Sequence, residues 1–549
     1  MNHVAPASTP DVIAVTNGIA EVFERYQIVG WVEAEKGAPP VHVGLYVNEI
    51  MAVETWAVDG AQRLGIGDVR TFRLQLDDFW RFVKVSDRIS VRVGGRAIPI
   101  AGKGMYLRPG NDGPDSTQHL QALLADGYVF GPSGKLQLSK AVDRAWQATV
   151  MRLYQRLRAT LAETVDYDLF LVYGTLLGVV RESAFIGHDL DFDCAYISSH
   201  PVGEAAAREL QQIAFVLIDT GFQVHWTRKA LHISDAESGG VGIELFHLYF
   251  DEAGRLQFPF GVAGRSDFIR SQWRGVREIP FAGSSALIPK GAEAIAEHIY
   301  GPSWRNPNPG FDWSRDRAQY AAEGIPTDHL IEEVYWADFY ARTSYDTGSS
   351  FFDLVSSRTD LPDMVVDIGC GDGRDSYAFA RAGRQVVGLD RSHVAIAHAT
   401  KKAQEMGLRS PVAFTACDVS DAKTLRATLT AARGEDPGRP VLFYARFFLH
   451  SIPEDTQRVM MTVIQQCSRH GDCFAAEFRT DKDEATAKVH GEHYRRFQNG
   501  PAFGRQLSRE YGFITKLVEQ EGNGFSPYKG EDPHLYRIIA RRDDHEMGT

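Results

Sequence analysis

Apolar and polar residues alternate over two stretches near the N-terminus. His42–Val47 and Arg88–Val93 both place apolar residues at every second position, the pattern of strands that are buried on one face. This predicts a small antiparallel β-sandwich between about residues 27 and 100, within a first domain at 1–110. We expect a structural or interaction module there, with carbohydrate binding as the alternative.

The apolar spacing changes further along the chain. Residues 101–115 are rich in Gly, Pro and Asp and are typical of a linker. Apolar residues then recur at helical spacing between positions 141 and 164, which predicts a helix at the start of a second domain at 125–318. From Val365 buried strands alternate with helical stretches, which predicts a parallel sheet in a third domain at 330–549. The expected fold class is multidomain, α/β and α+β.

Composition narrows the classes of protein. The 549 residues carry 59 Lys and Arg against 71 Asp and Glu, a net charge of −12, and 44% are hydrophobic. These values exclude wholesale disorder, a collagen-like repeat and a disulfide scaffold, and they disfavour binding of nucleic acid by bulk charge. The five cysteines lack metal-type pairing, which indicates a reducing compartment.

The longest apolar run, Leu169–Val180, is too short to span a bilayer, and the N-terminus lacks the pattern of a signal peptide. We therefore expect no transmembrane segment and a cytoplasmic protein, peripheral at most at the inner face of the membrane. A homo-oligomer is compatible with the sequence.

An acidic motif stands in the middle of the chain. Asp189, Asp191 and Asp193 alternate with Leu190 and Phe192. On an extended strand the three carboxylates share one face, where their repulsion would be relieved by Mg²⁺ or Mn²⁺. Because Mg²⁺ binds carboxylates together with substrate phosphates, the motif predicts a phosphoryl-transfer centre.

Two other interpretations of the acidic motif fit less well. A calcium-binding EF-hand loop needs Gly at its sixth position and Glu at its twelfth, where this chain has Cys194 and His200. A solvated acidic turn does not explain why the acids interleave with Leu190 and Phe192, which we expect to pack against a core.

Several motifs around these acids resemble one family. They are Tyr173-Gly-Thr-Leu-Leu-Gly178 with Arg181, Phe185-Ile-Gly-His-Asp-Leu-Asp-Phe-Asp193, Gly242–Phe246, and the series Ile288-Pro289, Tyr300-Gly301, Trp304 and Pro307. Between about Ser139 and Trp313 the chain is similar to the LicD/fukutin-type phosphotransferases of the DNA polymerase β-like nucleotidyltransferase superfamily. The resemblance implies that superfamily's α+β fold.

By this resemblance the domain transfers a phospho-alcohol from a CDP-activated donor to the hydroxyl of a glycan, free or lipid-linked. Its implied roles are donor-phosphate contact by Gly174 and Thr175 at a helix start, phosphate neutralisation by Arg181, and Mg²⁺ binding by Asp189, Asp191, Asp193 and Glu244. Glu244 could instead deprotonate the acceptor hydroxyl. His188 stands where the family usually has Trp, and either contacts the donor or a metal ligand, or is structural.

A glycine-rich loop opens the third domain. Val365–Ile368 is an apolar strand that runs into Gly369, Gly371 and Gly373, and three further strands follow, two of which lead to Asp390 and Asp418. This succession resembles the class I S-adenosylmethionine-dependent methyltransferases over about Val334–Arg541, with a Rossmann-like seven-stranded sheet. The resemblance places Asp367 and Gly369 at the methionine end, Asp390 at the ribose and Asp418 at the adenine. An NAD-binding fold is the alternative.

Cationic and polar residues gather after the fourth and fifth strands of this domain: Arg446, His450, Arg479, His493, Arg495 and Arg496. Their motifs are similar to methyltransferase domains fused to LicD-type domains in bacterial polysaccharide loci. We expect the arginines to bind a phosphate, with a solvated helix face as the alternative for Arg495 and Arg496. His450 is the candidate general base.

Together these features predict a bifunctional enzyme that decorates a surface polysaccharide such as capsule or O-antigen. The substrates are a CDP-alcohol and a glycan, the cofactors are S-adenosylmethionine and Mg²⁺, and no nucleic acid is expected. Two alternatives stay open: a nucleotidyltransferase that transfers a nucleoside monophosphate, and a glycan-binding scaffold with decayed sites.

Overall fold

A computed structural model describes residues 17–35, 38–63, 66–264, 267–307, 311, 322–342, 347–408, 410–434, 436, 438–486, 488 and 494–543. The chain divides into two compact units, Met1–Ile213 with Thr220–Pro326, and Thr327–Thr549 with Ala214–Asp219. The predicted domain limit at residue 318 and the predicted site residue His493 lie outside the described residues.

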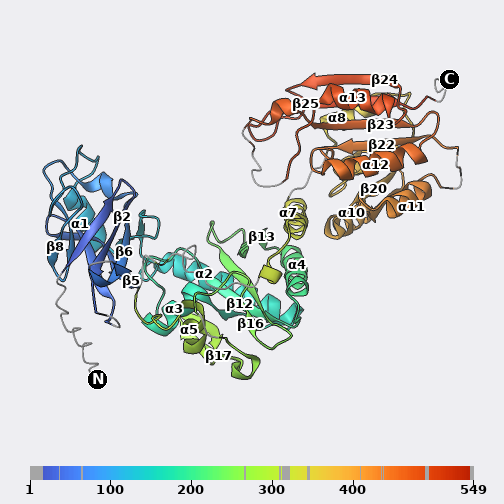
Figure 1. The fold of residues 1–549 in the computed structure, drawn as a ribbon. Coiled ribbons are helices and arrows are strands. Elements are labelled where there is room, and N and C mark those ends of the chain that lie inside the picture. Colours follow the sequence, from blue (N-terminus) through green and yellow to red (C-terminus); the bar gives the residue numbers. More distant parts are fainter. Residues whose placement is uncertain are drawn as a thin grey trace. The chain divides into compact units, whose positions relative to one another are not determined.

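Two four-stranded antiparallel sheets open the first unit (Figure 1). Their strand orders are β1-β2-β6-β5 and β4-β3-β7-β8. Buried side chains of both sheets, such as Ile28 and Leu74 from one and Val43 and Val91 from the other, form one apolar cluster. The strands are β1 (Gly18–Phe23), β2 (Gln27–Glu33), β3 (Val41–Val47), β4 (Ile50–Ala57), β5 (Asp59–Arg63), β6 (Gly67–Gln75), β7 (Ile89–Val93) and β8 (Arg96–Ile98).

A helix and a short hairpin follow these sheets: α1 (Thr117–Ala125), β9 (Tyr128–Phe130) and β10 (Leu136–Leu138). The hairpin turn is fastened to the N-terminal sheets by two hydrogen bonds, from Asp78 N–H to Gly134 O at 2.9 Å and from Leu136 N–H to Asp78 Oδ2 at 2.9 Å. Gly134 has φ +79°, and a Cβ there would lie 2.5 Å from Asp77 N, so this close approach requires glycine.

The rest of the first unit is an eight-stranded mixed sheet in the order β13-β14-β15-β12-β11-β18-β17, with β16 paired to β15. The predicted helix is α2, which begins after Asp143, whose side chain accepts from Trp146 N–H. The helices and strands of this part of the first unit are α2 (Arg144–Thr164), β11 (Phe170–Leu171), α3 (Tyr173–Glu182), β12 (Asp193–Ser198), α4 (Gly203–Asp219), β13 (Gln223–Trp226), β14 (Leu231–Ser234), β15 (Ile243–Phe250), β16 (Leu256–Gln257), β17 (Val276–Phe281), β18 (Ser284–Pro289) and α5 (Ala292–Tyr300).

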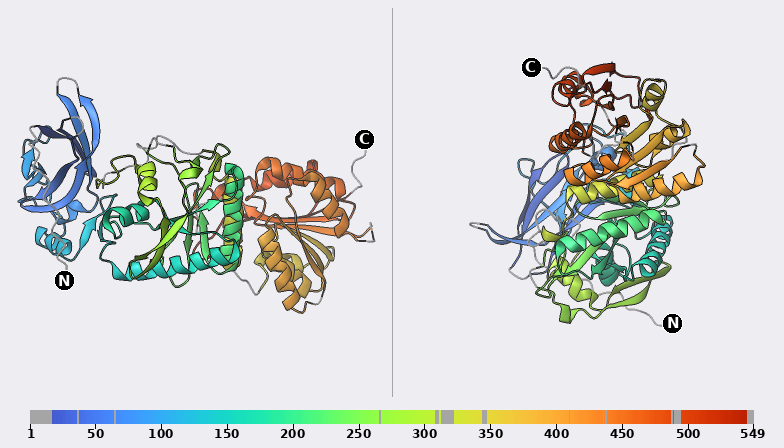
Figure 2. Two further views of the ribbon diagram at one scale, coloured as in Figure 1. Left: turned by 90° about the horizontal axis from the view of Figure 1, so that it is seen from below. Right: turned by 90° about the vertical axis from the view of Figure 1, so that its right-hand side faces the viewer.

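The second unit is a seven-stranded sheet in the order β21-β20-β19-β22-β23-β25-β24, with helices on both faces (Figure 2). Strands β19 to β23 are parallel and β25 is antiparallel to β23, which confirms the Rossmann-like prediction. Successive residues of β19 pack into the cores on opposite faces of the sheet, Val366 into one core and Val365 into the other.

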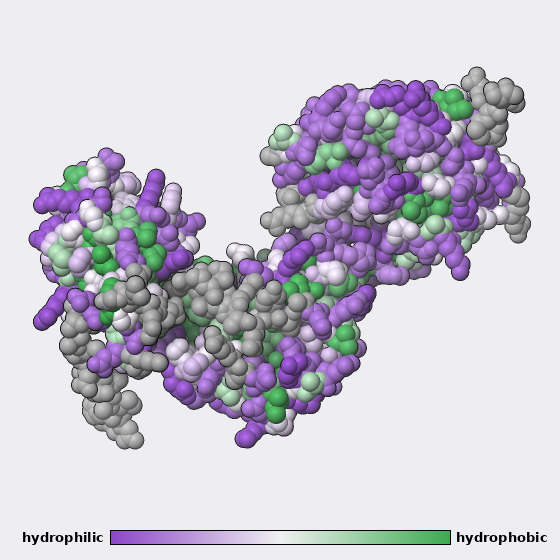
Figure 3. All heavy atoms as spheres, viewed as in Figure 1, coloured by the Kyte–Doolittle hydropathy of each residue, from purple (hydrophilic) through white to green (hydrophobic). Residues whose placement is uncertain are grey.

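The elements of this unit are α7 (Asp328–Arg342), α8 (Ser350–Ser356), β19 (Met364–Ile368), α9 (Arg374–Arg381), β20 (Gln385–Asp390), α10 (His393–Glu405), β21 (Val412–Ala416), α11 (Ala422–Ala432), β22 (Val441–Arg446), α12 (Glu454–Cys467), β23 (Cys473–Arg479), α13 (Gly500–Arg509), β24 (Thr515–Gly522) and β25 (Leu535–Arg541). The face of this unit that Figure 3 displays is mainly hydrophilic, and its apolar residues are scattered. Across the described residues, no helix combines the length and apolar character needed to cross a membrane.

A buried ion pair joins helix and strand in the second unit, and it gives a stability prediction. Asp472 is fully buried, pairs with Arg433 and accepts Val441 N–H at 2.8 Å. Asp472→Ala leaves a buried guanidinium without its charge partner, so we expect a loss of about 3–5 kcal/mol in unfolding free energy. Urea denaturation measures it, with Arg458→Ala, which breaks an exposed pair, as the control. Equal midpoints for the two variants would contradict the prediction.

Candidate active sites

The three acids of the middle motif do not share one strand. Strand β12 begins at Asp193, whereas Asp189 and Asp191 lie in the irregular segment that precedes it. The prediction of one extended strand is therefore wrong for the first two acids. Phe192 is buried as expected, but Leu190 is 50% exposed, because the irregular backbone does not alternate its side chains between two faces.

The carboxylates nevertheless converge on the start of α3. A Cβ placed on Gly174 would lie 2.4 Å from Asp189 Oδ2 and 3.2 Å from Asp193 Oδ2. Gly174 N–H donates to Asp193 Oδ2 at 2.8 Å, and Thr175 Oγ1 accepts from Asp193 N–H at 2.8 Å. Both residues predicted to contact the phosphates of the CDP donor, Gly174 and Thr175, therefore hold Asp193 in place.

Burial and mutual repulsion raise the pKa values of these acids. Burial first, and then the neighbouring charge of Asp191, raises the pKa of Asp189 to about 7. Burial, followed by the charges of Asp191 and Asp189, raises the pKa of Glu244 to about 7. The pKa of Asp193 is also raised, by burial and then by Asp189 and Glu244. The four acids thus form one electrostatic cluster.

The donor chemistry of this cluster fits a hard divalent cation, because every side chain offers carboxylate oxygens and their repulsion would be relieved by positive charge. As the side chains stand, however, the described residues contain no group of three or more His, Cys, Asp or Glu arranged to hold a metal ion. Metal binding by these acids therefore stays a prediction.

Two histidines extend the acidic cluster across the sheet. In the strand register Asp193 lies opposite Glu244, Glu244 opposite His232, and His232 opposite His225, so the four side chains form one row on one face. His232 Nδ1 is 3.4 Å from Glu244 Oε1. The sequence motifs missed both histidines, since only the pairing of β14 with β15 brings them to the acids.

The other two predicted residues of this site have local partners. Arg181 donates through Nε and Nη2 to the adjacent Glu182, at 3.0 and 2.6 Å. His188, the neighbour of Asp189 in the chain, lines a cavity that Glu54 of β4 also lines. A contact of either residue with a donor stays a prediction.

The glycine loop of the second unit has the expected backbone. Gly369, Gly371 and Gly373 have φ of +73°, +56° and +84°, which L side chains rarely adopt. Gly371 N–H donates to Asp390 Oδ2 at 3.0 Å, which ties the loop to the end of the neighbouring strand. A Cβ on Gly371 would lie 2.4 Å from the ring of Tyr340 in α7, so that ring rests directly on the loop.

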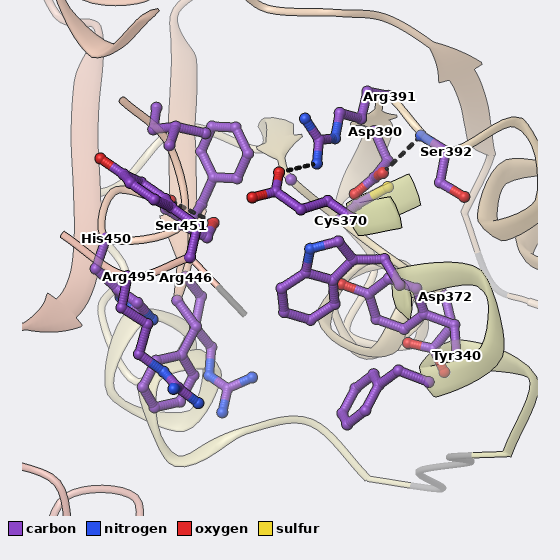
Figure 4. Close-up of a pocket in the computed structure, with 18 of the residues that line it drawn as sticks. Tyr340, Cys370, Asp372, Asp390, Arg391, Ser392, Arg446, His450, Ser451 and Arg495 are labelled. Atoms are coloured by element: carbon purple, nitrogen blue, oxygen red, sulfur yellow. Dashed lines mark hydrogen bonds and ion pairs between the residues drawn. The ribbon is translucent and has the colours of Figure 1, made fainter. Parts of the chain in front are cut away.

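The loop opens onto a pocket of about 740 Å³. Asp367, Gly369, Asp390 and Asp418, all predicted at the cofactor, line it, whereas Gly371 and Gly373 are not among its lining residues. Trp336 and Tyr340 of α7 also line it, and sequence reasoning missed them because α7 precedes the loop by some thirty residues of chain. Figure 4 shows Asp372, Asp390 and Arg391 on one side of the pocket, the acidic side, and His450, Arg446 and Arg495 on the other, the cationic side. Asp375 and Glu531 also line the pocket, where they pair with Arg446 and Arg479.

Three of the predicted arginines line the cationic side: Arg446, Arg479 and Arg495. Arg446 Nε lies 3.2 Å from Glu477 Oε1, and Arg479 Nη1 lies 2.7 Å from Asp483 Oδ2. Arg496 is not among the residues that line the pocket, and it donates to Gln457 and to Gln498 Oε1 instead. The structure therefore assembles most, but not all, of the predicted arginine group.

His450 lines the same side and is almost fully buried. Its Nδ1 accepts Arg479 N–H at 3.3 Å, and a neutral imidazole that accepts at Nδ1 carries its proton on Nε2. In this tautomer Nε2 carries a proton and is a hydrogen-bond donor. The predicted general-base role needs the other tautomer, so the local geometry favours a donor.

Comparisons with known proteins agree with both motif regions. Residues 166–291 match the model of the "LicD/FKTN/FKRP, nucleotidyltransferase domain", and residues 362–430 match a "Methyltransferase domain". Both resemblances drawn from the sequence are thereby confirmed, in one chain. A search of curated proteins found no match.

Solved structures similar to this chain include several methyltransferases, which cover 35–40% of it. Magnesium protoporphyrin IX methyltransferase from Synechocystis PCC 6803, with bound S-adenosylmethionine, is 16% identical over 39% of this chain and 82% of its own, with a TM-score of 0.25. A methyltransferase from Anabaena variabilis is 14% identical over 39% and 93%, with a TM-score of 0.30. A structure described as converting a disulfide bond into a thioacetal in echinomycin biosynthesis is 21% identical over 40% and 93%, with a TM-score of 0.31.

The buried acid before the glycine loop gives a pH prediction. Burial raises the pKa of Asp367 to about 7, and its Oδ2 accepts Ser376 Oγ–H at 2.6 Å. The folded state keeps this proton up to about pH 7, whereas an unfolded Asp releases it near pH 4, so the unfolding free energy should fall as pH rises between these values.

Asp367→Asn removes this titration and should stabilise the second unit at pH 7.5 by on the order of 1–3 kcal/mol, with less gain at pH 5. Chemical denaturation at both pH values measures the difference, and the exposed Asp353→Asn should follow the wild type. Parallel pH dependence for Asp367→Asn and wild type would refute the prediction.

Proposed function

Since the chain carries a LicD/FKTN/FKRP domain and a methyltransferase domain, we propose that it is a bifunctional enzyme that modifies a bacterial surface polysaccharide. The proposed domains are a β-sandwich at 1–110, a polymerase β-like domain at 125–318 and a class I methyltransferase at 330–549. The first enzyme domain transfers a phospho-alcohol from a CDP donor to a glycan hydroxyl, and the second methylates the glycan or its phosphate substituent. The proposed location is the cytoplasm, peripheral at most at the inner face of the membrane.

The observation that carries the transfer proposal is the convergence of Asp189, Asp193 and Glu244 beside the N-terminus of α3, within the matched LicD region. The four-acid cluster, with Asp191, is the proposed site of Mg²⁺ or Mn²⁺, which when bound would neutralise charge on the phosphates. Glu244 is either a ligand or the acceptor of the hydroxyl proton. Its contact with His232 leaves it within reach of a proton-accepting partner.

The reaction balances without an oxidant or reductant. The glycan oxygen forms a bond to the phosphorus that carries the alcohol, the bond from that phosphorus to the CMP oxygen breaks, and CMP leaves with the electron pair. The hydroxyl proton goes to a carboxylate or to solvent. Positioning and charge neutralisation are what such a transfer requires of the protein.

The transfer proposal is tested by CMP release from CDP-ribitol and CDP-choline in the presence of extracted surface glycan. Asp193→Asn should lower glycan-dependent CMP release at least 100-fold, because it removes a charge at the centre of the cluster. Glu237→Gln, an exposed acid of the same unit, is the matched control and should keep full activity. Pyrophosphate release from CTP instead would favour nucleotidyl transfer, and turnover of neither donor would leave only the glycan-binding scaffold.

The methyltransferase proposal rests on the glycine loop and the pocket beside it. Asp390 is fixed by Gly371 N–H and Ser392 N–H, and Asp418 lines the same pocket. The proposed role of Asp390 is to accept two ribose hydroxyls, and that of Asp418 is to accept from the adenine amine. S-adenosylmethionine, when bound, supplies a methyl group on a sulfonium. The acidic side of the pocket, with Asp367 and Asp372, suits that positive charge.

The cationic side of the pocket is the proposed acceptor side. Arg446, Arg479 and Arg495 lie where an anionic group of the acceptor would be bound, with His450 donating from Nε2. The acceptor oxygen forms a bond to the methyl carbon as the carbon–sulfur bond breaks, and the sulfur keeps that electron pair and becomes a neutral thioether. A glycan hydroxyl would release its proton to solvent in this step, whereas an ionised phosphate oxygen has no proton to lose. The main contribution of the protein to this methyl transfer is then to hold the acceptor oxygen close to the methyl carbon.

Calorimetric titration with S-adenosylmethionine tests the cofactor. We expect binding by the wild type, and Asp390→Ala should weaken it at least tenfold, or about 1.4 kcal/mol, through the lost ribose contacts. Glu405→Ala, an exposed acid at the end of α10, should bind like the wild type. Binding of NAD in place of S-adenosylmethionine, or equal affinity for Asp390→Ala and wild type, would overturn the assignment.

A further inference from the structure

A second cavity lies in the first unit, apart from the acidic cluster. It has a volume of about 250 Å³ and is lined by residues of β4 and β6, by the β9–β10 hairpin and by His188. The volume is below the ~300–1,000 Å³ of pockets that take nucleotides or drug-sized ligands. A ligand of the size of one sugar ring is therefore a better match than a nucleotide.

The cavity contains a buried polar group that lacks a partner. Thr55 of β4 lines the cavity and is 1% exposed, and its Oγ1 has no hydrogen-bond partner within the described part of the chain. A buried hydroxyl without a partner costs about 1–3 kcal/mol. Because Oγ1 has almost no accessible surface as the side chain stands, a ligand hydroxyl would pair with it only after the Thr55 side chain rotates about χ1.

The chemistry of the lining points to a polyol. Glu54, Arg73, Gln75 and His188 line the cavity and carry planar polar groups, which suit the donors and acceptors of sugar hydroxyls, and Phe130 adds an aromatic ring that suits the apolar side of a pyranose. The Glu54 carboxylate already lies 2.9 Å from His42 Nε2, which leaves its other oxygen for a ligand. One carboxylate and one guanidinium balance in charge, and the carboxylate would repel a phosphate. The lining thus fits a neutral sugar better than an anion.

The same hairpin connects the cavity to the acidic loop. Phe130 and its neighbours line the cavity, while Gln137 Nε2 donates to the carbonyls of His188 and Asp189, at 3.3 and 3.4 Å. His188 therefore belongs to the cavity and the next residue to the acidic cluster. A sugar held here would be presented beside the transfer site.

We propose that this cavity binds one neutral sugar residue of the acceptor glycan, so that the N-terminal sheets select the acceptor for the transfer domain. The identity of that sugar as part of the acceptor rests on the proposed transferase function. The binding of a sugar in the cavity does not rest on it.

Saturation-transfer NMR on the full chain tests the proposal, with the methyl glycosides of glucose, galactose, mannose and N-acetylglucosamine as probes. At least one glycoside should bind. Thr55→Val, which keeps the shape and removes the hydroxyl, and Gln75→Leu should each weaken that binding at least tenfold. Thr71→Val, the same change on β6 away from the cavity lining, is the control and should bind like the wild type.

Thermal unfolding of each variant separates lost binding from lost folding, and Thr55→Val should unfold no earlier than the wild type because it removes an unpaired polar atom. Binding of none of the glycosides, or unchanged binding in both cavity variants, overturns the proposal. Displacement of the bound glycoside by CMP or inorganic phosphate would also overturn it, because the cavity would then take the nucleotide.

The same NMR binding experiment with Asp193→Asn distinguishes sugar binding in the cavity from the transfer reaction. This variant should bind the glycoside normally while it loses CMP release. Glycoside binding without any CMP release in the wild type would count against the transferase and leave the cavity assignment standing. CMP release without glycoside binding would remove the cavity assignment alone.

Discussion

Repulsion between carboxylates withdrawn from water is the constraint on which both sites depend. In the first unit the acids converge beside Gly174, and in the second Asp390 is held against Gly371. In each case a glycine N–H donates to an acid, and a side chain on that glycine would collide, with an acid at Gly174 and with a ring at Gly371. The fold stabilises the acids through backbone dipoles that only a glycine can bring so close.

The same constraint explains why each ligand proposed for these sites brings a positive charge next to the acids. A divalent cation beside Asp193 and a sulfonium beside Asp367 would each lower the energy of charges that the fold alone leaves unbalanced. Each would accordingly bind the folded state more tightly than the unfolded one and stabilise its own unit. The cationic side of the second pocket is arranged differently, because Arg446 and Arg479 are each fixed by a buried carboxylate before any ligand arrives.

Local patterns predicted the parts of the structure that local physics decides. The apolar strand and positive-φ glycines of the second unit follow from residue types in sequence, and so does helix α2 with its cap at Asp143. The alternation of Asp189 to Asp193 looked like a strand but is largely irregular, and Leu190 is exposed as a result. A short period-two pattern does not identify a strand unless hydrogen bonding to a neighbour supports it.

The features that sequence reasoning missed are all set by contacts between distant segments. His232 reaches Glu244 through the register of β14 on β15, and Tyr340 reaches Gly371 because α7 folds over the loop. His188 is next to the acids in sequence, and its position predicts either a contact with the donor or a metal ligand or a structural role, whereas in the structure it lines the cavity together with Glu54. Adjacent residues of an irregular segment can serve two sites, and this is how one short loop comes to join the N-terminal sheets to the acidic cluster.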